Sequence, residues 1–212
     1  MPPLDEPPPL PSPKRRAGCA TWLLRLFAIG VVLVVAASGT MLFLMRSGRI
    51  PDSRILDRHE LHERIVDRLR ALELQEGEEI VLFYSGAPFD VVFDGNLLTD
   101  RRVVSWFEND DEERVVDSVD LDSIDRIEVR FTSHVFEDST LEVYENVGGD
   151  SIYSATLLLS NEEDGDHLFV EELVKRARRA DAPLRAVEVS GEISGEELSR
   201  IPDAVRVESA EQ

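Results

Sequence analysis

The chain has 212 residues, of which 43 are acidic and 23 are basic, and its net charge is −20. This balance argues against nucleic-acid binding, because a negatively charged surface is repelled by phosphates. The one cysteine, Cys19, rules out a disulfide framework or a cluster of thiolate metal ligands within the chain. We expect one domain of ordinary size after the most apolar stretch, because about 165 residues remain there.

Residues 1–21 are predicted to form a disordered tail. Seven of the chain's 11 prolines lie between Met1 and Pro13, and proline lacks the amide donor that helices and sheets require. Cys19 stands just before the apolar stretch, where a palmitoyl chain is sometimes attached. An unmodified thiol is the alternative interpretation of Cys19.

Residues 22–45 are predicted to form a transmembrane helix. From Leu26 to Met45 no side chain is charged, and twenty helical residues span roughly 30 Å, the thickness of the hydrocarbon core of a bilayer. The basic residues 14–16 precede this run, as they would in either a cleaved signal peptide or an uncleaved anchor. We favour the anchor because the run continues beyond Ala36–Ser38, the one suitable cleavage site.

The side of the membrane that holds the acidic domain is not fixed by the sequence. Basic residues flank the apolar run on both sides, so the positive-inside rule gives no clear orientation. These residues are Lys14, Arg15 and Arg16 before it and Arg46, Arg49, Arg54 and Arg58 after it.

Residues 52–75 are predicted to form an amphipathic helix next to the membrane, capped by Asp52 or Ser53. Its apolar residues recur at helical spacing and are Leu61, Ile65, Leu69 and Leu72. This face either packs on the domain, which we favour, lies on the membrane or pairs with another copy. The nearby histidines, His59 and His62, are three residues apart rather than four, so they do not match the metalloprotease zinc motif.

Residues 78–180 are predicted to form mainly antiparallel β-structure that ends in a helix. Apolar and polar residues alternate in Ile127–Phe131, as in a strand with one buried face. Strands are expected at about 79–84, 91–93, 96–99, 102–107, 114–119, 126–131, 140–144 and 152–159. From Asp166 the period becomes helical, with Asp164 or Asp166 as the cap.

The C-terminal extension, residues 181–212, is predicted to contain a strand, a short helix and a weak strand. Ser194 followed three residues later by Glu197 matches a capping box for the short helix.

Two segments of the β-rich region resemble bacterial pleckstrin-homology-like (PH-like) domains. Gly95–Trp106 resembles a hairpin of that family in which Leu-Thr is followed, after two residues of any type, by an arginine and a hydrophobic residue. Val119–Ile124 resembles the segment that follows this hairpin in the family. The resemblance covers about residues 78–180 and implies an α+β, mainly β fold: an antiparallel barrel with a C-terminal helix across one open end. It also implies a binding or scaffolding module without a shared catalytic residue.

The same resemblance draws attention to Arg101 and Arg102 as ligand contacts. Phosphoinositide-binding PH domains carry basic residues around their first hairpin, whereas the corresponding segment 85–94 here has neither lysine nor arginine. Arg101 and Arg102 are the next basic residues along the chain, and the alternative is that they pair with Asp100 or Glu108.

The sequence favours a non-catalytic protein-binding or scaffolding module that is held at a membrane by residues 22–45. It contains no nucleophile motif, phosphate-binding loop or metal-ligand cluster that would indicate an enzyme or a cofactor. The partners expected are the bilayer, an unknown protein and a second copy of the chain. The alternatives are an exported soluble protein whose leader is cleaved, and an enzyme with an unrecognised site.

Overall fold

The computed structural model describes residues 18–46, 54–87, 91, 93–108, 113–134 and 137–207. The chain divides into two compact units, Met1–Phe43 and Leu44–Gln212, and each is treated by itself. Most of the predicted tail, the predicted caps Asp52 and Ser53 and the centre of the loop at 109–112 lie outside the described residues.

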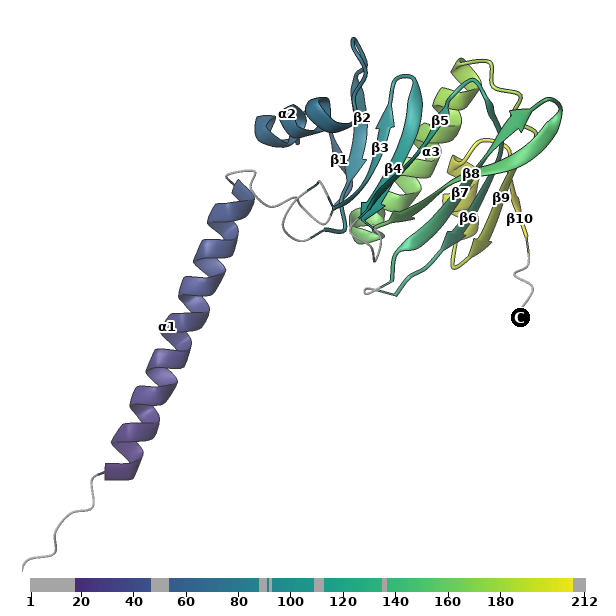
Figure 1. Cartoon of the computed structure of the whole chain (residues 1–212). Coiled ribbons are helices and arrows are strands. Elements are labelled where there is room, and N and C mark those ends of the chain that lie inside the picture. The colour runs from purple at the N-terminus through teal and green to yellow at the C-terminus, as the bar shows by residue number, and fades with distance from the viewer. Residues whose placement is uncertain are drawn as a thin grey trace, which may run out of the picture. The chain divides into compact units, whose positions relative to one another are not determined.

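The first unit consists of one long helix, α1 (Gly18–Arg46) (Figure 1). Within it, Trp22–Leu44 has a mean hydropathy of 2.4 in its most apolar window, and none of that window is buried by protein. The hydroxyl of Thr40 donates a hydrogen bond to the carbonyl of Ala36, 2.9 Å away, so this polar group is satisfied within the helix. By length and composition the helix is able to cross a bilayer.

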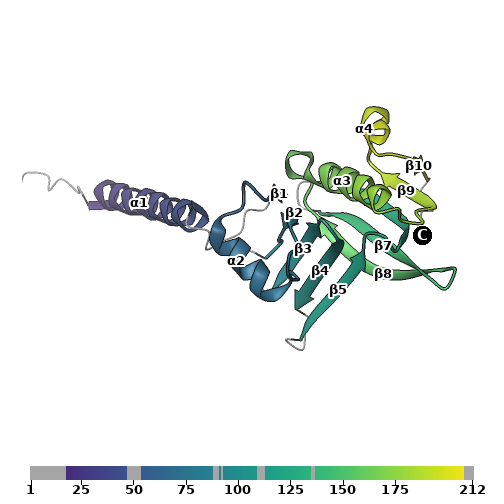
Figure 2. The ribbon, with the colours of Figure 1, turned by 90° about the horizontal axis from the view of Figure 1, so that it is seen from above.

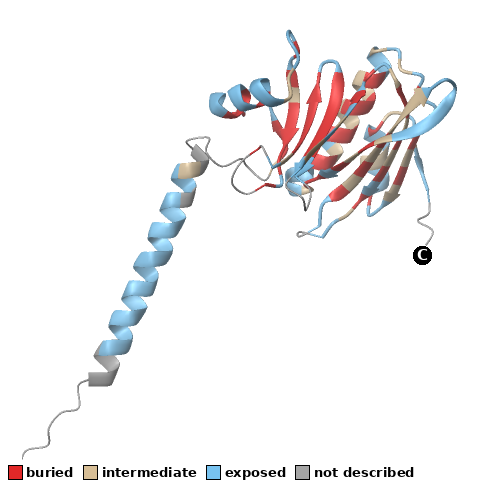
Figure 3. Ribbon diagram, viewed as in Figure 1, coloured by how far each residue is buried: buried red, intermediate tan, exposed pale blue. Residues whose placement is uncertain are grey.

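The second unit begins with a five-stranded antiparallel sheet, here called the first sheet. Its strands lie in chain order: β1 (Leu56–Asp57), β2 (Ile80–Tyr84), β3 (Asp94–Thr99), β4 (Arg102–Glu108) and β5 (Arg114–Asp120). Consecutive residues of β2, β3 and β4 are buried, because both faces of this sheet are covered (Figure 3). The long buried runs therefore reflect two separate clusters of apolar side chains.

The helix α2 (Glu63–Leu72) packs on one face of the first sheet. Its buried residues Ile65, Val66 and Leu69 join a cluster with apolar side chains of β2, β3 and β4, including Phe83, Leu97, Val104 and Trp106. The predicted start of this helix is wrong. The Nδ1 atom of His62 accepts the Arg64 N–H at 3.2 Å and caps the helix there, while Leu56 and Asp57 pair with β2 instead.

A second five-stranded sheet, here called the second sheet, is mixed. Its strands are, in spatial order, β10 (Ala204–Arg206), β9 (Ala186–Gly191), β6 (Ile124–Phe131), β7 (Ser139–Val147) and β8 (Asp150–Leu159). The 3-10 turn η1 (Glu162–Asp164) leads into the helix α3 (Gly165–Arg179), and the short helix α4 (Gly195–Arg200) connects β9 to β10 (Figure 2).

The main core lies between the two sheets and α3. It combines Leu98 and Val103 of the first sheet with Ile127 and Leu141 of the second, and Phe169 of α3 is completely buried among them. The apolar face predicted for α3 is therefore the face that packs on both sheets.

The antiparallel barrel implied by the resemblance is not closed among the strands that the structure describes, which form two sheets. β6 pairs with β7 along one edge and in parallel with β9 along the other, so neither edge is available to β5. The two sheets therefore stay separate, and the fold is a mixed α+β arrangement with a helix against both sheets.

Residues of the predicted C-terminal extension complete the second sheet. Gly191 ends β9 at a φ of +84°, and a Cβ added there would lie 2.1 Å from the carbonyl oxygen of Phe131. Only glycine allows this close approach of β9 to the end of β6. The capping box predicted at Ser194 and Glu197 is present at the start of α4.

Candidate binding site

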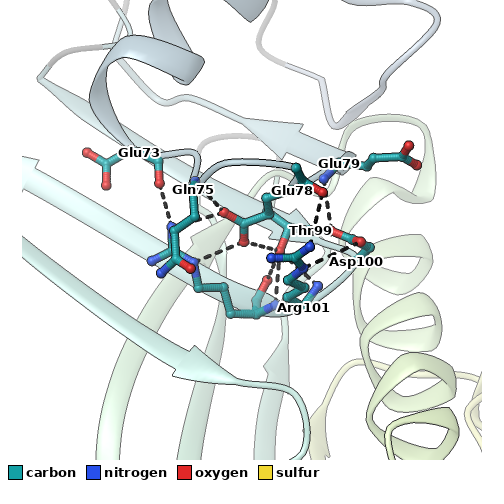
Figure 4. Close-up of polar contacts among 9 residues, drawn as sticks. Glu73, Gln75, Glu78, Glu79, Thr99, Asp100 and Arg101 are labelled. Carbon is teal, nitrogen blue, oxygen red and sulfur yellow. Dashed lines mark hydrogen bonds and ion pairs between the residues drawn. The ribbon is translucent and has the colours of Figure 1, made fainter.

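The turn between β3 and β4 is organised by the hydroxyl of Thr99. Its Oγ1 accepts the backbone N–H groups of Arg101 at 3.1 Å and Arg102 at 2.9 Å, and donates to Glu78 Oε1 at 2.6 Å (Figure 4). Asp100 Oδ1 accepts the N–H of Glu79 at 2.8 Å. These bonds tie the turn to the segment that precedes β2.

Arg102 forms a buried ion pair with Glu78. Arg102 Nε lies 3.0 Å from Glu78 Oε1, Nη2 lies 3.1 Å from Oε2, and the two side chains are 10% and 0% exposed. Nη2 also donates to the carbonyl of Glu73 at 2.5 Å. Burial raises the pKa of Glu78, but hydrogen bonds from Arg102, Thr99 and the Gln75 backbone outweigh it and hold the pKa below its usual range.

Arg102 is therefore committed to the fold, and the structure does not support it as a ligand contact. Arg101 is different, because 53% of its side chain is exposed. Its Nη2 lies 3.3 Å from the carbonyl of Gly77, and its Nε lies 4.0 Å from Asp100, one of the two carboxylates considered as its partner. The side chain of Cys19, the proposed lipidation site, lies outside the described residues.

The surface near Arg101 is poorly suited to a phosphate group. A hollow of about 400 Å³ close by is lined by residues that include Arg70, Glu76, Glu78 and Glu79. Glu78 is neutralised by Arg102. The remaining carboxylates, Glu76 and Glu79, offset the charges of Arg70 and Arg101, so the hollow has no excess of positive charge to attract an anion. The geometry therefore gives no support to recognition of a phosphoinositide headgroup at this hairpin.

The outer face of the second sheet carries a different hollow of about 400 Å³. It is lined by Glu128, Val129, Arg130, Thr140, Glu142, Glu188, Ser190 and Val207. The strand register places Glu128 of β6 directly opposite both Glu188 of β9 and Glu142 of β7. Three half-buried glutamates thus lie side by side across three neighbouring strands; we call them the glutamate row.

Two of the three glutamates have partners on the same face. Arg126 lies 2.8 Å from Glu128 and 4.0 Å from the centroid of the Tyr144 ring, and the Tyr144 hydroxyl donates to Glu142 at 2.8 Å. Burial, with help from the bond to Glu142, raises the pKa of Tyr144 to about 12, so it remains a donor at neutral pH. The side chain of Glu188 has no hydrogen bond or ion pair with another described residue.

The glutamate row has an electrostatic cost, because like charges directly opposite each other destabilise a sheet. A partner that places lysine or arginine side chains over the hollow would relieve this repulsion. The row has no local signal in the sequence, because Glu142 reaches Glu128 through the antiparallel pairing of β6 with β7, and Glu188 joins them only through the parallel pairing of β6 with the distant strand β9.

The combination nearest to a nucleophilic site is Ser139, Asp166 and His167. Ser139 Oγ donates to Asp166 Oδ2 at 2.5 Å rather than to the imidazole, and Ser139 is completely buried. The arrangement links β7 to the start of α3 and exposes no nucleophile. Of the two predicted caps, Asp164 occupies the N-cap position of α3 without a side-chain capping bond, and the carboxylate of Asp166 is buried between the Ser139 hydroxyl and the His167 N–H. Among the described residues, no group of three or more side chains is arranged to hold a metal ion.

Two carboxylates, the half-buried Asp94 of β3 and the exposed Asp138 just before β7, lie near the buried Tyr84 of β2. The Tyr84 hydroxyl donates to Asp138 Oδ2 at 3.0 Å, and Asp94 is close enough to Asp138 to be affected by its charge. Burial, followed by the Asp138 charge, raises the pKa of Asp94 above its ordinary value.

Replacement of Asp94 by asparagine is expected to stabilise the domain at neutral pH by up to about 1 kcal/mol. A carboxyl whose pKa is raised in the folded state stabilises it at low pH and loses that contribution as pH rises through the folded pKa. The gain of Asp94→Asn should therefore shrink as pH falls through the raised folded pKa of Asp94, and it should be absent below the ordinary value of about 4. Urea unfolding of the parent protein and of Asp94→Asn at several pH values measures this gain in stability. A gain of equal size at every pH would contradict the prediction.

No protein-family model matches the chain, and no curated protein matches it. Solved structures give distant likenesses. The hSac2 domain of the human phosphoinositide phosphatase Sac2 is 15% identical, with a TM-score of 0.38, over 66% of this chain and 92% of that one. A DUF1696-family protein with a pleckstrin-homology domain from Shewanella loihica is 13% identical, with a TM-score of 0.38, over 61% of this chain and 99% of that one.

A pleckstrin-homology domain from Shewanella amazonensis is 16% identical, with a TM-score of 0.41, over 57% of this chain and 91% of that one. These neighbours include pleckstrin-homology domains, the class named by the sequence resemblance. With TM-scores below 0.5, the likenesses assign neither a ligand nor an activity to this chain.

Proposed function

We propose that this protein is a single-pass membrane protein whose PH-like domain binds a protein partner and performs no catalysis. The observation that carries this proposal is the segment Trp22–Leu44 of α1, which is 23 residues long, is mainly apolar, and has a most apolar window that no other part of the protein buries. Burial of such a side chain is worth roughly 1.5–3 kcal/mol, so a helix that is apolar on all sides is strongly favoured in lipid. Its role is to concentrate the acidic domain at a membrane.

The binding surface in this proposal is the glutamate row on the second sheet. The partner contributes a segment with lysine or arginine side chains, which pair with Glu188 and Glu142 and screen the repulsion within the row. Arg126, stacked on Tyr144 and paired with Glu128, supplies a rigid edge to this surface. Pairing at a partly solvated surface adds mainly to specificity and association rate.

Site-specific crosslinking of the full chain in its native membranes tests the binding surface. A photoreactive residue in place of Thr140, within the hollow, is expected to capture a partner protein. The same residue in place of Ser118, exposed on the first sheet, is the control and should capture it much less. Capture of the chain alone from position 140 in every condition would contradict the proposal.

Charge reversal separates the role of the row from that of the membrane anchor. The double variant Glu142→Lys, Glu188→Lys should lose most crosslinking from position 140 while remaining in the membrane. Asp122→Lys reverses a charge on the exposed turn between β5 and β6 and should leave the crosslink intact. Equal loss in both variants would show that only the overall charge matters.

The alternative of an exported soluble protein rests on the position of the apolar helix near the N-terminus. A cleaved leader would remove most of α1 and leave only the second unit. The mass of the mature chain isolated from cells distinguishes an uncleaved anchor from a cleaved leader, because the proposal requires residues 22–44 to be retained.

A further inference from the structure

Two members of the glutamate row, Glu142 of β7 and Glu188 of β9, lie on either side of β6. The third member, Glu128 of β6, is paired with Arg126 at 2.8 Å. Neither Glu142 nor Glu188 forms an ion pair with a described residue, and Arg130, which borders the same hollow, pairs with neither of them. Two unbalanced carboxylates therefore remain on the outer face of the second sheet, one on each side of β6.

The separation of these two carboxylates determines which kind of chain segment is able to pair with both. Neighbouring strands are about 4.8 Å apart, so Glu142 and Glu188 are separated by roughly 10 Å across the strands. Helical residues that are seven positions apart are separated by about 10.5 Å along the helix axis and by only about 20° around it. In an extended segment, residues on the same face are about 6.7 Å or about 13 Å apart, and neither distance matches. The carboxylates therefore fit two basic residues on one face of a helix that crosses the strands.

Apolar side chains are exposed at both edges of this face. Val205 of the edge strand β10 lies directly opposite Glu188, and 64% of it is exposed. At the other edge, Leu158 of β8 lies opposite Thr140 of the hollow, and 51% of it is exposed. From β10 to β8 the sheet is four strand spacings wide, or about 19 Å, which is the length of about 13 helical residues. A helix of about four turns thus reaches from one apolar edge to the other.

We propose that the partner's binding segment is a basic amphipathic helix that lies across the five strands of the second sheet. This inference rests on the proposed function and specifies the chemistry of the partner. The helix carries two arginines or lysines seven positions apart, which pair with Glu142 and Glu188, and its middle turn passes over Glu128, which is already paired. Apolar residues about one turn outside the two basic residues cover Val205 and Leu158. The charge pairs fix the position of the helix, and the apolar contacts add buried area.

Two synthetic peptides of identical composition test the spacing of the basic residues. Each has about 18 residues of alanine, glutamine and leucine with two arginines, enough for about five helical turns. In the first peptide the arginines are seven positions apart, and in the second they are nine positions apart, on opposite sides of the helix. Fluorescence anisotropy of the labelled peptides with the full chain in uncharged detergent micelles measures both affinities. We expect the first peptide to bind roughly fivefold more tightly, the effect of one additional surface ion pair.

Variants without the two charges show whether this preference comes from the two carboxylates. In the double variant Glu142→Gln, Glu188→Gln, both peptides should bind equally. Asp122→Asn, on the exposed turn between β5 and β6, is the matched control and should keep the preference. Equal binding of the two peptides to the parent chain, or an unchanged preference in the double variant, would overturn the inference.

Crosslinking in native membranes separates this inference from the proposed function. A photoreactive residue in place of Val205, at the far edge of the row, should capture the same partner as the photoreactive residue at position 140. Capture from position 140 without capture from position 205 would leave the binding surface intact and would contradict a helix that crosses all five strands. Capture of a partner from neither position would contradict the proposed function and the inference with it.

Discussion

Replacement of Arg102 by leucine is expected to lower the free energy of unfolding of the domain by about 3–5 kcal/mol, because it leaves the buried carboxylate of Glu78 unpaired. The side chain of Glu78 is completely buried, and Arg102 also donates a hydrogen bond to the Glu73 carbonyl. Urea unfolding followed by tryptophan fluorescence measures the change, since Trp106 belongs to the same sheet.

Two further variants identify the cause of this loss. Arg101→Leu changes the neighbouring, half-exposed arginine and should cost less than about 1 kcal/mol. Glu78→Leu combined with Arg102→Leu removes both charges and should be less damaging than Arg102→Leu alone. Equal losses of unfolding free energy for Arg101→Leu and Arg102→Leu would show that the ion pair of Arg102 with Glu78 does not stabilise this part of the domain.

The same ion pair gives a pH dependence of known sign. The pKa of Glu78 is lowered in the folded state, so its contribution to stability is present above the pKa of the unfolded chain. That contribution should be lost as pH falls through the lower, folded pKa. The difference in stability between the parent protein and the double leucine variant should therefore shrink on acidification below about pH 4.

Replacement of Leu69 by alanine is expected to destabilise the second unit by about 2–5 kcal/mol, because the substitution leaves a cavity within a closely packed apolar cluster. Leu69 is completely buried between α2 and the first sheet. Arg64→Ala, on the exposed surface of the same helix, should change stability by less than about 0.5 kcal/mol. A negligible effect of Leu69→Ala would indicate that α2 lies elsewhere, for example on the membrane.

Local patterns in the sequence predicted the elements that depend on neighbours in the chain. The alternation in Ile127–Phe131 predicted β6 because one face of that strand is in the core. The Ser194 and Glu197 spacing predicted the start of α4 because a capping box is formed within four residues. Such signals need no knowledge of the tertiary structure.

The features that the sequence did not predict depend on distant pairings. The strand β1 has two residues and is specified by the edge of β2 that it joins, rather than by its own composition. The parallel pairing of β9 with β6 occupies the second edge of β6, and no local residue pattern predicts a partner that comes 60 positions later in the chain. Arg102 was considered as a ligand contact because of the resemblance, with Asp100 or Glu108 as the alternative partner, but its partner is Glu78, 24 residues before it.

The candidate sites also depend on residues that are distant in the chain, and local patterns did not predict them. The surroundings of His167 have no local signal in the sequence, because the residues around it come from β6, η1 and α4 as well as from its own helix. The glutamate row was also invisible, because its members occur singly in three strands. Arg101 keeps an exposed side chain but stands beside carboxylates, so the resemblance to phosphoinositide-binding domains does not extend to this position.

The central claim is that residues 22–44 stay in the bilayer and hold the folded domain there. Alkaline extraction of membranes from cells that make the full chain tests it most directly, because this treatment removes proteins bound only at the surface. We expect the intact chain of 212 residues to remain entirely with the sedimented membranes. Recovery of that intact chain in the alkaline supernatant would contradict the account.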